Sequence, residues 1–206
     1  MKKLLLATAV ATFASSALAA EGTFYLRGDL GGSILPTQRE KNYDIKVKSS
    51  THLVGDLGVG YYLMDNVRSE VVLSNHFSPK QKGSKNGLDI KVAPLATSLH
   101  VKGLVDFYDF GFGQTYFGAG LGLSQVSGKF TAKYMGVESA MKWKKKNNFS
   151  YLLTVGAGFD VADGVKLDVA YSYNDHGKLS KLKGSTSSVK YNLRTHDITG
   201  GVRVEL

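Results

Sequence analysis

The sequence predicts an all-β protein, an eight-stranded antiparallel up-and-down transmembrane barrel of the outer-membrane type. Three observations predict it. Eight segments alternate apolar and polar residues with a period of two, which is the spacing of a half-buried strand. Short turns and long polar loops alternate between these segments, and the polar face carries charges of both signs. With 206 residues, 43% of them hydrophobic, the chain suits one domain of this kind and is too apolar for a disordered protein.

The first residues have the layout of a secretory signal peptide, which we expect over residues 1–19. Two lysines are followed by an apolar stretch over 4–13, and Ala17-Leu18-Ala19 supplies the small residues of a cleavage site. The alternative is an N-terminal membrane anchor, for which this apolar run is short. Cleavage leaves one exported domain over 20–206. The zero cysteine count argues against a lipoprotein anchor, a disulfide scaffold and a cysteine nucleophile.

The remaining chain divides into segments whose side chains alternate between an apolar and a polar face. In one of them Val165, Leu167 and Val169 alternate with Lys166 and Asp168. Most segments hold about ten residues, the length that a tilted strand needs to cross a bilayer. The eight expected strands are 23–35, 52–63, 67–77, 95–107, 117–124, 149–160, 165–174 and 197–206.

The connections between these strands are short and long in strict alternation. Tight turns are expected at 64–66, 108–113 and 162–164. In an outer-membrane barrel the short turns and both termini are periplasmic, and the long loops are extracellular. The long loops with high charge are expected at about 36–51, 78–93, 126–148 and 174–193.

A period of two does not distinguish a soluble barrel, which is apolar inside, from a membrane barrel, which is apolar outside. Two features favour the membrane barrel: aromatic residues gather at both ends of the apolar face, and glycines lie beside long charged side chains on the polar face. Eight strands enclose only enough space for side chains, so we expect a plugged lumen with paired charges. The expected lumen charge network is Arg27, Asp29, Arg68, Glu70, Lys102, Asp106, Asp168, Asp197, Arg203 and Glu205.

Positive charge is concentrated in the long loops, which hold 18 basic and 5 acidic residues, whereas the whole chain has a net charge of +9. Such a basic rim attracts polyanions over about 8–10 Å at physiological salt. The sharpest candidate ligand-binding cluster is Lys142, Trp143, Lys144, Lys145 and Lys146, in which the indole adds a stacking or apolar anchor. The alternative is a solvated loop whose lysines only hold outer-leaflet phosphates. Nucleic acid is not expected as a partner of a surface rim.

We expect no enzyme, no metal site and no cofactor. The five histidines lack metal-ligand spacing, and the sequence contains neither an HExxH nor a G-x-S-x-G motif. A lipid-modifying enzyme at the outer rim is the alternative, with His76 beside Ser78 or His176 beside Ser180.

Several segments resemble one family of outer-membrane proteins over essentially the whole mature chain. The sequences YLRGDLG (25–31), VDFYDF (105–110), YFGAGLG (116–122) and HDITGGVRV (196–204) look like the opacity-protein type of eight-stranded barrel. The lysine-rich loops, together with GYY at 60–62 and NVR at 66–68, look more specifically like the small rickettsial surface adhesins.

This resemblance implies a monomeric outer-membrane barrel that attaches bacteria to host cells, and related adhesins also capture serum proteins such as vitronectin. We therefore expect a surface adhesin of the bacterial outer membrane, in contact with outer-membrane lipid and lipopolysaccharide. Its basic extracellular loops would bind host-cell or serum proteins or sulfated glycans. The alternative function is a structural barrel that stabilises the membrane by binding lipopolysaccharide.

Overall fold

A computed structural model describes residues 21–40, 45–77, 80–85, 87–135, 137–179 and 191–206, and the expected signal peptide lies outside them. None of the described residues forms a helix of the length and apolarity that would cross a membrane. The strands are β1 (Phe24–Leu35), β2 (Gln38–Glu40), β3 (Ile45–Val47), β4 (Ser50–Met64), β5 (Val67–Phe77), β6 (Gln81–Lys85), β7 (Leu88–Asp109), β8 (Gly113–Tyr134), β9 (Val137–Ala162), β10 (Val165–Leu179) and β11 (Tyr191–Glu205).

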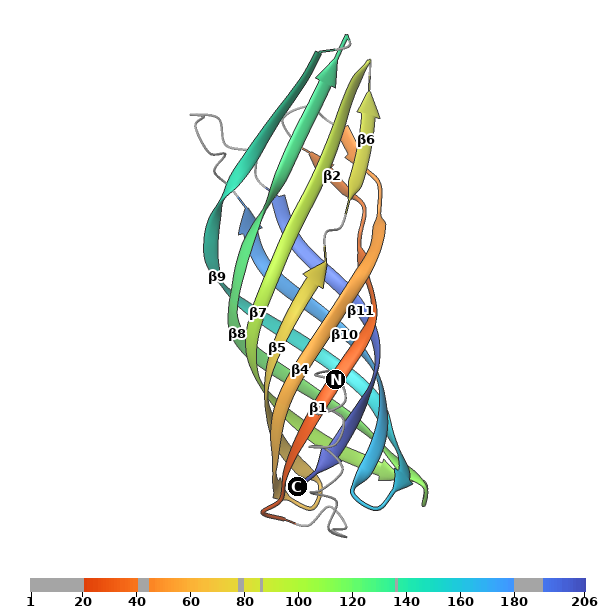
Figure 1. Cartoon of the computed structure of the whole chain (residues 1–206). Coiled ribbons are helices and arrows are strands. Elements are labelled where there is room, and N and C mark those ends of the chain that lie inside the picture. Colours follow the sequence, from red (N-terminus) through yellow and green to blue (C-terminus); the bar gives the residue numbers. More distant parts are fainter. Residues whose placement is uncertain (1–20, 41–44, 78–79, 86, 136, 180–190) are drawn as a thin grey trace, which may run out of the picture.

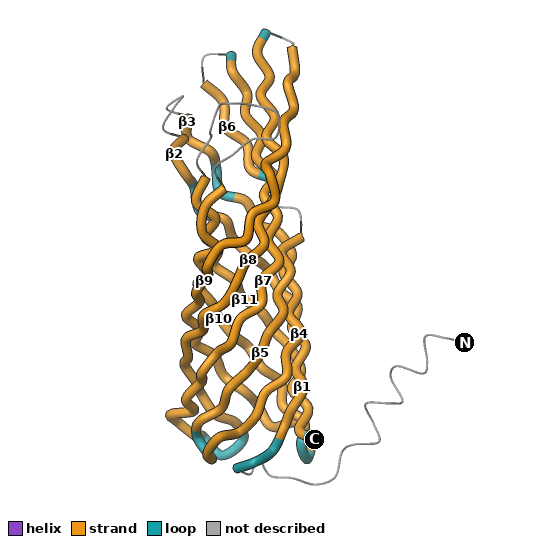
Figure 2. Tube along the Cα trace, turned by 90° about the vertical axis from the view of Figure 1, so that its left-hand side faces the viewer, coloured by secondary structure: helices purple, strands orange, loops and turns teal. Residues whose placement is uncertain are grey.

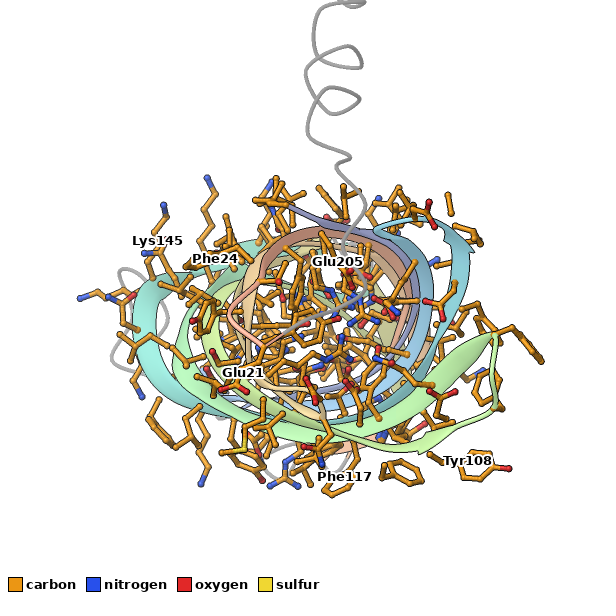
Figure 3. All side chains as sticks on the ribbon, turned by 90° about the horizontal axis from the view of Figure 1, so that it is seen from below. Glu21, Phe24, Tyr108, Phe117, Lys145 and Glu205 are labelled. Atoms are coloured by element: carbon orange, nitrogen blue, oxygen red, sulfur yellow. The ribbon has the colours of Figure 1, made fainter. Side chains whose placement is uncertain are left out.

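Eight of these strands form a closed antiparallel ring (Figures 1 and 3). The order is β5-β4-β1-β11-β10-β9-β8-β7, and the pairing of β5 with β7 closes the ring. Every neighbouring pair is antiparallel, and β1 pairs with β11 over ten residue pairs from Tyr25↔Glu205 to Ile34↔His196. The predicted eight-stranded up-and-down barrel is therefore confirmed. Closure leaves each wall strand paired on both sides, which is what a lipid environment requires of backbone groups.

Tight turns close the end drawn lowest in Figure 1. Gly164 and Gly111 lie in the turns β9–β10 and β7–β8 with φ of 68° and 89°, a region that L side chains rarely adopt. The Gly111 N–H also donates to Asp109 Oδ1 at 2.6 Å. The first described residues and the end of β11 lie at the same end, since Leu206 N–H donates to Phe24 O at 2.8 Å.

The lower part of the barrel carries an apolar belt on its outside. Leu57, Val71, Leu153 and Val169 point outward and are 48–68% exposed. Figure 3, seen along the barrel from below, shows Phe117 and Tyr108 on the outside of the ring. Arg203, in contrast, is fully buried inside. The orientation that distinguishes a membrane barrel from a soluble one is therefore the one observed.

Strands β7, β8 and β9 are 22, 22 and 26 residues long in total. They continue well above the belt (Figure 2). Along β7 the alternation runs on without a break, but its chemistry inverts. Lys102 and His100 face the interior in the belt, whereas Ile90 and Val92 face it higher up, where Lys91 points outward. The cause is the surrounding medium, because apolar side chains face lipid in the belt and turn away from water above it.

The interior of this upper part, which we call the extension, holds its own hydrophobic core. Trp143 of β9 lies 5.9 Å from the ring of Phe130 and 6.3 Å from that of Tyr191, measured between centroids. The buried members of this apolar cluster are Leu35, Ile90, Val92, Ala96, Val126, Phe130, Trp143, Leu179, Tyr191 and Leu193.

The expectation of long loops is therefore wrong for much of their length. The segments 78–93 and 126–148 are largely strand, and 36–51 contains β2, β3 and the start of β4. In 174–193, β10 continues to Leu179 and β11 begins at Tyr191. These segments keep a period of two, but lysines at the outward positions give them the composition of polar loops.

The single tryptophan makes the core of the extension measurable by itself. Trp143 is 3% exposed, so we expect a blue-shifted emission that acrylamide quenches weakly. Phe130→Ala removes a buried ring and should lower the free energy of unfolding of the extension by roughly 3–5 kcal/mol. Urea titration followed by tryptophan emission measures this free energy of unfolding. The gel mobility of the unboiled protein, which reports on the folded belt, should not change.

Tyr134→Ala is the matched control, because it removes an aromatic ring that is 52% exposed on the same strand. If the urea concentration at the midpoint of unfolding falls equally in both variants, the apolar cluster does not stabilise the extension.

Candidate functional site: a basic surface above a sealed lumen

Glu70 of β5 is the centre of one charged group in the lumen. Its carboxylate accepts hydrogen bonds from Arg27 Nη1 at 3.0 and 3.1 Å and from the Tyr25 hydroxyl at 2.8 Å. Lys102 Nζ lies 2.7 Å from its second oxygen. Arg27 also donates from Nε to Asp29 Oδ2 at 2.8 Å. One buried carboxylate thus compensates two cations that could not otherwise stay in a dry interior.

A second group is built around Arg203 of β11. Its guanidinium donates to Asp168 Oδ1 at 3.1 Å and to the Tyr62 hydroxyl at 2.7 Å. The Tyr62 hydroxyl in turn donates to Glu205 Oε1 at 3.2 Å. Strands β4, β10 and β11 are therefore linked by one chain of side-chain bonds.

Arg68 is held differently, by an ion pair and an aromatic ring. Its Nη2 lies 3.3 Å from Asp106 Oδ1, and its guanidinium carbon lies 4.5 Å from the centroid of the Tyr116 ring. This cation–π contact is strong in a desolvated site. Nine of the ten residues of the expected network thus enter these two groups and this pair, and Asp197 lies higher in the lumen.

Glycines on the lumen face make room for the tyrosines. A Cβ on Gly60 would lie 2.0 Å from Tyr25 Cζ, and one on Gly156 would lie 2.6 Å from the same atom of Tyr116. Tyr25, Tyr62 and Tyr116 were not expected in the network, although the parity of Tyr25 with Arg27 places both on the lumen face. The tyrosines fill the lumen and also supply hydroxyl and ring partners for the cations.

Asp197 lies in a layer of histidines above these charges. It accepts hydrogen bonds from Ser33 at 2.5 Å and from Asn174 at 2.7 Å, and His76 Nε2 lies 2.9 Å away. The ring of His176 packs 4.7 Å from that of His76. Among the described residues, no group of three or more histidines and acids is arranged to hold a metal ion.

The histidines considered for a rim enzyme do not reach the rim. His76 is 2% exposed and His176 is fully buried, and both point into the lumen below the apolar cluster. Ser78 and Ser180 lie outside the described residues. The geometry therefore provides no approach for a lipid to either imidazole.

Polar groups also support the apolar cluster that covers this layer. The Tyr191 hydroxyl donates to Gln81 Oε1, and Gln81 Nε2 donates to the carbonyl oxygens of Leu35 at 3.3 Å and Pro36 at 3.2 Å. Burial raises the pKa of the Tyr191 hydroxyl above its ordinary value, so it stays protonated as a donor. These bonds attach β6 to β1 and β11.

A β-bulge on β9 presents the lysines of the candidate cluster. Val126 of β8 pairs with Lys146 and Gly128 pairs with Trp143, so Lys144 and Lys145 together face one residue of β8. A bulge of this kind lets two consecutive side chains leave the alternation. Both lysines are exposed, and Figure 3 shows Lys145 pointing away from the ring.

Trp143 does not belong to this basic surface. Its side chain is 3% exposed and packs inward against Phe130 and Tyr191. The expectation that its indole anchors a ligand among the lysines is therefore wrong, because the residue continues the inward parity of the extension. It supports the surface from behind instead.

Lys129 of β8 joins the surface, since it is exposed and pairs directly with Lys142. Like charges in directly opposed positions of a sheet destabilise it. We call Lys129, Lys142, Lys144, Lys145 and Lys146 the β9 lysine site. All five side chains are exposed, and among the described residues none of them forms an ion pair.

The belt, the charged lumen and the closed ring together define an outer-membrane β-barrel. The chain belongs to the family described as outer membrane protein beta-barrel domain, whose model matches residues 5–205. Its relatives include proteins named as candidate adhesins from Rickettsia bellii and Rickettsia massiliae, each 34% identical over all of this chain. The alignments cover 100% and 99% of those proteins. This is a protein of the outer membrane with adhesin-type relatives.

Solved structures share the fold. Neisserial surface protein A superposes with a TM-score of 0.57 and 22% identity, over 90% of this chain and 100% of that one. OprG from Pseudomonas aeruginosa gives a TM-score of 0.57 and 16% identity, over 91% and 97% of the two chains.

The network around Glu70 predicts that its carboxylate is required for the stability of the barrel. Glu70→Gln should lower the free energy of unfolding by roughly 3–5 kcal/mol, since it leaves Arg27 and Lys102 buried without their common counterion. Urea unfolding in lipid vesicles, followed by gel mobility without boiling, measures the loss. Asp65→Asn, at an exposed turn position, is the control and should unfold like the unsubstituted protein. Equal unfolding midpoints of the two variants would contradict the assignment.

Proposed function

We propose that this protein is a surface adhesin whose extension faces the outside of the cell and binds anionic host surfaces through the β9 lysine site. The observation that carries the proposal is the exposure of five lysines on one packed sheet, with Lys144 and Lys145 turned outward together by the bulge. The names of the rickettsial relatives support an adhesive role.

Rigid presentation supports binding. Lysines on a disordered loop would lose conformational entropy when they bind, whereas strands that are already ordered limit this cost. Trp143 and Phe130 pack directly behind the site and hold its sheet in place. The site is therefore arranged before any ligand arrives.

The charge of the site selects the class of ligand. Five ammonium groups without acidic partners among the described residues favour a polyanion. Sulfated glycans and acidic patches on host-cell or serum proteins have this chemistry. Lipopolysaccharide phosphates also have it, and binding to them would make the barrel a stabiliser of its own membrane.

The orientation and the oligomeric state belong to the same proposal. In outer-membrane barrels the short turns lie in the periplasm and the long hairpins outside. The tight turns at 65–66, 110–112 and 163–164 then face the periplasm, together with the first described residues and Leu206. A monomer is favoured because the closed ring leaves no unpaired strand edge in the belt.

Charge reversal tests this function. Lysines near an anionic surface contribute about 1 kcal/mol each, so replacing three of them by glutamate should weaken binding about 100-fold. The variant is Lys142→Glu with Lys144→Glu and Lys145→Glu. Binding of the folded barrel in lipid nanodiscs to immobilised heparin and to host cells gives the readout.

A triple variant with the same change of charge is the control: Lys80→Glu, Lys133→Glu and Lys178→Glu. All three of these side chains are exposed, and none belongs to the β9 lysine site. An equal loss of binding in both triple variants would show that binding depends on overall charge and not on the β9 lysine site. Normal host binding combined with detergent sensitivity of cells that lack the protein would favour the membrane-stabilising function instead.

A further inference from the structure

A pocket opens on the extension at β6 and β7, beside the strand β8 that carries Lys129 of the β9 lysine site. It has a volume of about 430 Å³ and lies where the chain after β3 runs beside the β6–β7 hairpin. Figure 2 shows β3 and β6 together at the upper end of the molecule. Its lining residues are Lys48, Lys82, Gly83, Ser84, Asp89, Ile90 and Lys91.

Three lysines converge on this pocket from separate segments. Lys82 and Lys91 occupy directly opposed positions of β6 and β7. The third, Lys48, is held beside them because its N–H donates to Lys82 O at 2.9 Å. Among the described residues none of the three has an ion pair, and Asp89 is the single carboxylate of the lining. Opposed like charges weaken a sheet, so an anion in the pocket would relieve the repulsion.

The other lining groups suit a small polar ring. Ile90 is 1% exposed and its side chain belongs to the apolar cluster, so it supports the lining from inside. On the accessible side, Ser84, Asp89 and the backbone of Gly83 offer hydrogen-bonding groups, and Ser84 lies directly opposite Asp89. A pocket of this size with a few convergent polar groups has the properties of a small-ligand site.

We propose that this pocket binds one sugar residue that carries a single sulfate or carboxylate. The anionic group lies among Lys48, Lys82 and Lys91, and Asp89 accepts a hydrogen bond from a sugar hydroxyl. Asp89 also repels a second anionic group on the same ring. The inference rests on the proposed function, because it names a specific ligand for a surface that is expected to attach to host glycans.

The compact shape of the pocket argues for a sugar residue over an acidic peptide. An extended peptide needs a groove or a free strand edge along which it can lie. At the pocket, β6 pairs with β7 on one side, and its other edge is met by Lys48, whose N–H donates to Lys82 O at 2.9 Å. One end residue of a glycan chain can enter such a site while the rest of the chain remains outside.

The test uses the complete folded barrel in lipid nanodiscs and titration calorimetry. The probes are N-acetylneuraminic acid for the carboxylate, glucosamine 6-sulfate for the sulfate, lactose as a neutral sugar and a tetraglutamate peptide. Either charged sugar should bind, and Lys82→Gln with Lys91→Gln should weaken that binding at least about tenfold. The relative affinities of the two charged sugars decide which anionic group the pocket prefers.

Two further variants keep the result interpretable. Lys145→Gln with Lys178→Gln makes the same change of charge outside the pocket and should bind the sugars normally. Lys91→Arg keeps the charge and should retain most of the binding. Tryptophan emission of each variant verifies that the extension is folded, and the pocket variant should resist urea at least as well as the unsubstituted protein because a repulsion is removed.

The failure of this proposal is distinguishable from that of the proposed function. Sugar binding that survives in the pocket variant, or tetraglutamate that binds more tightly than either charged sugar, would overturn the pocket assignment. The β9 triple variant should still bind the small sugars although it loses heparin. If only the β9 triple variant loses heparin binding and neither the unsubstituted protein nor any variant binds a sugar, the adhesin function is supported. The same result contradicts the pocket assignment.

Discussion

The structure depends on the fact that lipid accepts neither a charge nor an unpaired backbone group. Ring closure satisfies the backbone, since every wall strand has two partners. The ionic side chains that remain must then face inward, where Glu70 and Asp168 compensate the cations around them. Paired charges and tyrosine rings lie in the lumen, where they support the wall of the belt.

The same strands meet a second solvent when they leave the belt. Because water replaces lipid on the outside, the inward face changes from Lys102 and His100 to Val92 and Ile90 within one strand. The belt therefore has a polar interior and an apolar outside, whereas the extension has an apolar core and a polar outside. The same strands run through both parts. This continuity gives the lysines on the outside a rigid base that isolated loops would lack.

The two basic sites follow from details of strand pairing. A bulge opposite Ser127 turns Lys144 and Lys145 outward together, and the register of β6 with β7 places Lys82 directly opposite Lys91. Both arrangements gather like charges whose repulsion an anionic ligand would reduce. Part of the positive charge of the chain is thus gathered on two defined surfaces.

The sequence by itself determined the number and facing of the belt strands, because the alternation of Leu167 and Val169 with Lys166 and Asp168 has one interpretation once lipid is the solvent. It also indicated where basic charge accumulates. It could not show that 126–148 is largely strand, since lysines on several outward positions hide an apolar face that becomes visible only through Trp143 and its neighbours. Which charges pair, where the bulge lies and that three lysines line one pocket were decided by the tertiary structure alone, because each depends on the register between strands.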